Sequence, residues 1–77
     1  MKLIWKPITE CDDDNGNHTV WSAEVNHPTY GRYFWISMNE DGYTLEYEAN
    51  GNYKPLVYCK SLAAAKRWAA MEVNEQN

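Results

Sequence analysis

The segment KSLAAAKRWAAMEV, residues 60–73, is the one stretch of this 77-residue chain whose pattern predicts a helix. Ser61 is a suitable N-cap, because its hydroxyl can accept a hydrogen bond from a backbone N–H of the first turn. Alanine, the strongest helix former, recurs five times in the segment. One face of the expected helix, over about residues 62–73, is apolar and consists of Leu62, Ala65, Ala69 and Val73. We also expect Trp68 to anchor this helix at the rim of whatever it covers.

Before this segment, strand-like runs alternate with turns. Residues 43–48 (YTLEYE) show the cleanest apolar–polar alternation, which is typical of a strand with one buried face. Pro7 and Pro55 cannot donate to a ladder and indicate edge strands. Asp41-Gly42 and Asn15-Gly16 are dipeptides that favour tight hairpins, with Asn15-Gly16 expected to supply a pair of positive φ angles. The predicted strands are about residues 2–9, 18–25, 32–38 and 43–48, with a short one at 55–58.

These elements predict an α+β fold in a single domain, residues 1–77. We expect an antiparallel meander of three to four strands with one C-terminal helix packed on one face. Because the chain has a single helix, nothing remains in the sequence to cover the other face of the sheet.

Charge and composition restrict the class of function. The formal net charge is -4, which argues against a basic module that binds duplex nucleic acid. The only basic concentration is Lys60, Lys66 and Arg67. Four Trp and six Tyr are more aromatic side chains than one small core can hold, so some should lie at the surface. The sequence shows no signal peptide and no apolar run that could span a membrane, so we expect a cytoplasmic protein with two free thiols. A disulfide between Cys11 and Cys59 stays open, because it depends on whether the fold brings the two residues together.

The stretch CDDDNGNH, residues 11–18, has ligand types that invite a metal interpretation. As a calcium loop with Gly16 at its sixth position, it would need acidic ligands where Cys11 and Ser22 stand. A zinc site from Cys11, His18, His27 and Cys59 would lack the close ligand spacing of structural sites. We therefore predict a hairpin loop with an acidic tip, two ordinary loop histidines, and no metal or other cofactor.

Catalysis is not expected. Cys59 stands just before the predicted helix, whose N-terminus could lower a thiol pKa, but a cleft and a histidine partner would also be needed. We interpret Cys59 as a semi-buried thiol at a strand end. The sequence has no spaced pair of carboxylates for acid–base chemistry and no glycine-rich phosphate loop.

The uncovered sheet face is the candidate site. Strand alternation predicts large aromatic anchors with an acidic rim on this face, which favours a basic protein partner. The predicted partner-binding residues are Tyr33, Trp35, Glu24, Glu46, Glu48, Asp12, Asp13 and Asp14. Coverage of Tyr33 and Trp35 by a loop, by the N-terminal strand or by a second copy in a homodimer stays open. Single-stranded nucleic acid stacked on the aromatic rings is a further alternative, which the glutamates disfavour.

Residues 61–72 (SLAAAKRWAAME) resemble the closing helix of many small phage and prophage proteins. In these proteins a few antiparallel strands precede a Ser-Leu-x-x-Ala-Lys-x-x-Ala helix. Compact acidic proteins of this kind include inhibitors of bacterial defence systems, among them anti-CRISPR proteins. The resemblance implies an accessory protein that inhibits a host nucleic-acid-handling or defence complex in the host cytoplasm, and it assigns no functional residue.

Overall fold

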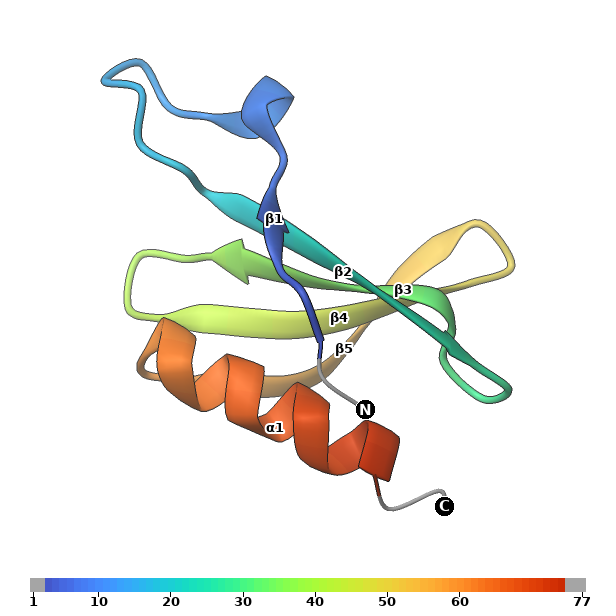
Figure 1. Ribbon diagram of the computed structural model, residues 1–77. Coiled ribbons are helices and arrows are strands. Elements are labelled where there is room, and N and C mark those ends of the chain that lie inside the picture. The colour runs from blue at the N-terminus through green and yellow to red at the C-terminus, as the bar shows by residue number, and fades with distance from the viewer. Residues whose placement is uncertain (1–2, 75–77) are drawn as a thin grey trace.

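The computed structural model describes residues 3–74 and has the predicted α+β fold, with an antiparallel sheet and one C-terminal helix (Figure 1). The sheet contains five strands in chain order rather than three or four. The elements are β1 (Lys6–Pro7), the 3-10 helix η1 (Thr9–Cys11), β2 (Val20–His27), β3 (Gly31–Met38), β4 (Tyr43–Ala49), β5 (Asn52–Cys59) and α1 (Leu62–Asn74). Every pair of neighbouring strands is antiparallel.

The N-terminal strand is much shorter than predicted. Only Lys6 and Pro7 pair with β2, opposite Ser22 and Trp21. Pro7 has no N–H to donate, and the chain turns into η1 at Thr9 instead of continuing the ladder. The predicted strand at 2–9 is therefore wrong over most of its length, and its first residue lies outside the described part of the chain.

Two other strands have different limits from those predicted. β2 begins and ends two residues later than the predicted 18–25. β5 is an eight-residue edge strand, not a short piece at 55–58. Its early start follows from the turn before it, where Asn50 and Gly51 have φ angles of 55° and 82°. Both central residues of this two-residue loop are left-handed, which matches the twist of a hairpin and lets Ala49 pair with Asn52 at once.

The connection between β3 and β4 requires a glycine at position 42, because no side chain fits there. Asn39 N donates to the Gly42 carbonyl at 2.7 Å across residues 39–42. Gly42 does not have a positive φ angle, unlike the glycines at 16, 31 and 51. A Cβ atom at Gly42 would lie 2.4 Å from the backbone oxygen of Cys59, so close approach of β5 excludes a side chain here.

Helix α1 covers one face of the sheet and contacts β3, β4 and β5. Ser61 caps it as predicted, because Ala64 N donates to the Ser61 hydroxyl at 3.1 Å. Ala65, Ala69 and Val73 are buried against the sheet. Small side chains at these positions allow the helix to lie close to the strands. No helix within residues 3–74 has the length and apolar character needed to cross a membrane.

The core lies between α1 and the sheet. Phe34, Ile36 and Leu45 are its largest fully buried side chains, and Ile36 pairs with Leu45 across β3 and β4. Trp68 does not anchor the helix as predicted, because it is 43% exposed and lies outside the core cluster. A helix turns by about 100° per residue, which places position 68 at the flank of the face that carries Ala65 and Ala69, where much of the ring is exposed.

Candidate functional site

Along β2, β3, β4 and β5, the residues that alternate with the buried ones form the face of the sheet opposite α1. The strand register pairs Glu24 with Tyr33, Trp35 with Glu46, and Glu48 with Tyr53. Because side chains alternate along a strand, these residues lie on the side away from Phe34 and Leu45. We call this surface the open sheet face, defined by Glu24, Tyr33, Trp35, Glu46, Glu48 and Tyr53.

Three aromatic rings form a continuous cluster on the open sheet face. The Trp35 and Tyr53 ring centroids are 4.9 Å apart in an edge-to-face arrangement, and those of Tyr33 and Trp35 are 5.8 Å apart. Tyr33 and Trp35 are half-buried, whereas Tyr53 is 61% exposed. Tyr53 is not among the predicted partner-binding residues, because β5 was predicted to begin only at residue 55. The Asn50-Gly51 hairpin signal just before it could have revealed this position.

The N-terminal segment borders this cluster without covering it completely. A shallow groove of about 250 Å³ lies beside Trp35 and Tyr53. The groove is lined by Ile8, Cys11, Val20, Trp35, Ser37, Glu46 and Tyr53. A second hollow of about 470 Å³ lies at the other end of the face and is lined by Ile4, Lys6, Ser22, Glu24 and Tyr33. The face therefore offers two open depressions beside the rings.

The three predicted glutamates of the face differ in how they are engaged. Glu24 forms an ion pair with Arg32, with 3.4 Å between Oε2 and Nε, and both side chains are largely exposed. Glu46 accepts a hydrogen bond from the Ser37 hydroxyl at 2.7 Å, and Glu48 accepts one from Gly51 N at 3.2 Å. Within residues 3–74 neither Glu46 nor Glu48 has a cationic partner. Their negative charges are positioned by these contacts and not neutralised.

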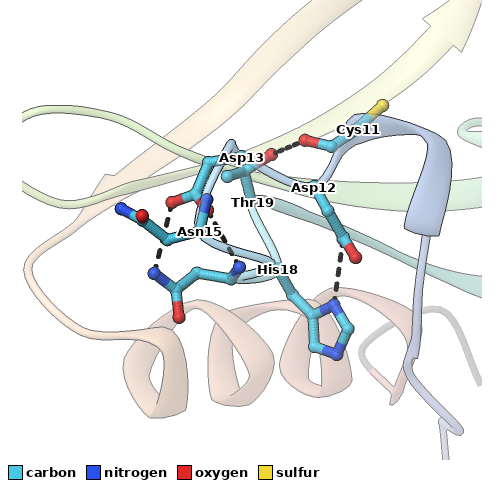
Figure 2. A network of polar contacts seen from close by, with 7 residues as sticks. Cys11, Asp12, Asp13, Asn15, His18 and Thr19 are labelled. Carbon is cyan, nitrogen blue, oxygen red and sulfur yellow. Dashed lines mark hydrogen bonds and ion pairs between the residues drawn. The ribbon is translucent and has the colours of Figure 1, made fainter.

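The predicted acidic tip lies apart from the glutamates. Figure 1 shows the loop between η1 and β2 extending beyond the start of β2, on the side away from α1. Figure 2 shows that much of its polar chemistry is internal to the loop. Asp12 contacts His18 Nδ1 at 3.0 Å, and the exposed Asp14 lies at the turn. The structure thus does not bring Asp12–Asp14 into the open sheet face.

Asp13 organises this loop. Its Oδ1 accepts hydrogen bonds from the backbone N–H groups of Asn15 and Asn17, both at 2.9 Å. Gly16 has a φ angle of 81°, but Asn15 has no positive φ, so the predicted positive-φ pair at Asn15-Gly16 is wrong. The carboxylate of Asp13 closes the turn in place of a left-handed Asn15.

Acidification is expected to loosen this loop. The backbone N–H of Asn17, followed by that of Asn15, lowers the pKa of Asp13 below its ordinary value. A lowered pKa means that the ordering is present above the ordinary aspartate value and is lost as pH falls through the Asp13 pKa. In an NMR titration, the amide signals of Asn15 and Asn17 should move with Asp13. In an Asp14→Asn control these shifts should persist, whereas unchanged amide shifts in the wild type would contradict the assignment.

The two cysteines are free and lie in different environments. Cys11 is exposed, and Cys59 is buried at the end of β5. Burial raises the pKa of the Cys59 thiol, because the thiolate would lose contact with water. The buried position supports the interpretation of Cys59 as a thiol packed at a strand end.

Thiol labelling should distinguish these cysteines. In the native protein at mildly alkaline pH, we expect Cys11 to react fast with an aromatic disulfide reagent and Cys59 to react much more slowly. Unfolding in urea should make both thiols reactive. Mass spectrometry of the labelled peptides identifies the site, and fast native labelling at Cys59 would show that this residue is not packed as described.

His27 is not an ordinary loop histidine as predicted. It is the last residue of β2 and is only 7% exposed. Its Nδ1 accepts the backbone N–H of Thr29 at 3.0 Å, and its ring stacks on Tyr30 with centroids 4.7 Å apart. The Tyr30 hydroxyl donates to Glu72 of α1 at 2.8 Å. This cluster connects the β2–β3 turn to the helix and has a structural role.

No three His, Cys, Asp or Glu side chains within residues 3–74 come together in a way that could hold a metal ion. Comparison with known proteins finds no matching family model, no matching curated protein and no matching solved structure. The open sheet face is the best candidate site. Its aromatic rings line a groove beside Glu46 and near Glu48, which have no cationic partner within residues 3–74.

Proposed function

We propose that this chain is a non-enzymatic binding module that recognises a basic protein surface through the open sheet face. The observation that carries the proposal is that the Trp35–Tyr53 ring pair lies beside Glu46, which pairs with Trp35 across the strands and lines the same groove. A partner would place apolar side chains against the rings and lysine or arginine against the glutamates. We expect no catalytic step and no cofactor.

The aromatic cluster supplies the apolar part of this recognition. Trp and Tyr are enriched among the residues that dominate binding energy, because they bury a large area and lose little conformational freedom. Trp35 is held edge-on by Tyr53, so much of its ordering has already occurred in the free protein. The neighbouring groove of about 250 Å³ gives a partner side chain a place to enter.

The carboxylates supply the charge preference. Glu46 and Glu48 have no cationic partner within the described residues, so a basic partner gains their full attraction. Glu24 contributes less, because Arg32 already lies beside it. Complementary charge mainly increases the association rate and excludes acidic competitors.

We further propose that the partner belongs to a host nucleic-acid-handling or defence complex, which this protein inhibits. Two features support this: the resemblance of residues 61–72 to the closing helix of small phage proteins, and an acidic face that could occupy a nucleic-acid channel. Such channels are lined by Lys and Arg. In this case the protein would act in the cytoplasm of the host.

Binding of single-stranded nucleic acid is the alternative that the exposed Tyr53 ring favours, since bases stack on such rings. A capture experiment with C-terminally immobilised protein, together with a gel shift on single-stranded oligonucleotides at low salt, separates the two functions. We expect the immobilised chain to capture a protein that salt elutes. We expect the gel to show no shift of the oligonucleotide. A salt-sensitive shift without a captured protein would contradict the proposal.

A further inference from the structure

The outward side of α1 carries a second surface of interface-like composition. It consists of Arg67, Trp68 and Met71, which we call the outer helix face. Trp68 and Met71 are 43% and 45% exposed. Trp, Met and Arg are the residue types enriched in protein interfaces. Exposed large apolar side chains that adjoin on one helix face indicate a docking surface.

Helix α1 carries two cations, Lys66 and Arg67, and one acid, Glu72, whereas acids outnumber bases in the rest of the chain. A third cation, Lys60, precedes the helix, and its amino group lies over the Tyr58 ring of β5. None of the three cations forms an ion pair within residues 3–74. The open sheet face, on the other layer, carries Glu46 and Glu48 without cationic partners. The molecule therefore presents complementary charges on its two layers.

We propose that the outer helix face of one copy docks on the open sheet face of a second copy, an inference that rests on the proposed function of the sheet face. Trp68 would contact the Trp35–Tyr53 cluster and its groove, and Arg67 would approach Glu46 and Glu48. Both surfaces also match in length. The 13-residue helix is about 20 Å long, and the seven-residue strand β4 is about 23 Å long.

The two surfaces lie on opposite layers, so one copy can engage a neighbour on each side. Such a head-to-tail contact joins two unlike surfaces, so a dimer keeps one surface of each kind free and further copies add to form open chains or closed rings. Pairing two sheet faces would place Glu46 and Glu48 of each copy near those of the other, and like charges in an interface are costly. The charge pattern therefore favours the head-to-tail arrangement over a symmetric dimer.

Self-association of this kind would compete with binding of the partner. If the outer helix face fits the open sheet face, we expect the partner to present a similar surface, namely a helix with a large apolar side chain beside lysine or arginine. The chain carries one such helix itself. Dilution or a tighter partner would release the sheet face by mass action.

The test uses sedimentation velocity on the full chain and two variants, each blocked on one face. Glu46→Lys/Glu48→Lys blocks the sheet face, and Trp68→Ala/Met71→Ala blocks the outer helix face. All four positions lie outside the buried core, and circular dichroism with thermal unfolding checks that both variants fold. Wild-type protein should sediment faster with rising concentration, beyond a dimer, and added salt should weaken this association about tenfold or more.

Each variant alone should remain monomeric, and an equimolar mixture should form a one-to-one complex and nothing larger. A dimer of the helix-blocked variant alone would indicate sheet-to-sheet pairing and overturn the proposal. A dimer of the sheet-blocked variant alone would indicate helix-to-helix pairing and overturn it equally. Monomeric wild type up to millimolar concentration would also overturn it. If the wild type is monomeric but its capture of a partner still depends on Glu46 and Glu48, this proposal fails and the proposed function is retained.

Discussion

Replacing Trp35 by alanine is expected to reduce partner binding about thirtyfold or more and to leave a folded protein. The binding loss corresponds to about 2 kcal/mol, the level at which an interface residue counts as a hot spot. Trp35 is half-buried and contacts Tyr33 and Tyr53 on the open sheet face. We expect its removal to lower the free energy of unfolding by only about 1–2 kcal/mol, within the ordinary range for single substitutions.

Phe34→Ala is the matched control, because Phe34 is the neighbouring residue on the same strand and points to the opposite side. Phe34 is fully buried, and its ring lies 5.3 Å from that of Tyr30. Its loss should lower the free energy of unfolding by about 3–5 kcal/mol. Denaturant unfolding and binding titrations on both variants separate the roles. A Trp35→Ala protein as unstable as Phe34→Ala would show that Trp35 belongs to the core.

Reversing the charge of Glu46 and Glu48 together is expected to weaken partner binding about a hundredfold, which is close to abolition. Like charges across an interface cost several kcal/mol, and about 1.4 kcal/mol corresponds to a factor of ten. Glu46 and Glu48 lie on β4 without cationic partners among the described residues. The change should act mainly on the association rate and should diminish at high salt.

The matched control is Glu40→Lys/Asp41→Lys, which changes the net charge of the chain by the same amount. Glu40 and Asp41 are exposed in the β3–β4 turn, away from the Trp35 cluster. We expect this variant to bind within about threefold of wild type, since distant exposed charges are largely screened. Equal losses in both variants would show that overall charge, and not the open sheet face, attracts the partner.

The central part of the fold follows from local chemistry. Alternation in residues 32–38 and 43–48 predicts β3 and β4 nearly to their ends, because one side of each strand must be buried under α1. Ser61 and the alanines predict the helix to within one residue at its end. The N-terminal strand was predicted too long, because Leu3, Ile4 and Trp5 look like a strand but lie outside the ladder, in which only Lys6 and Pro7 pair with β2.

The residues of the candidate site that lie on strands could be predicted from the alternation of side chains along each strand. Those that lie in loops could not, because the sequence does not specify where a loop lies relative to the sheet. Tyr33, Trp35 and Glu46 follow directly from the strand period. Tyr53 was missed because the ladder of β5 begins earlier than its proline indicates. The position of Asp12–Asp14 depends on how the loop after η1 leaves the sheet, which no local pattern specifies.

Backbone hydrogen exchange of the protein, alone and with its captured partner, tests the open sheet face as the binding surface most directly. We predict that bound partner slows exchange in β3, in β4 and around Tyr53, while residues 12–17 exchange as before. The same measurement on Glu46→Lys/Glu48→Lys should show no partner-dependent protection. Protection confined to α1 or to the acidic loop, with β3 and β4 unchanged, would contradict the account.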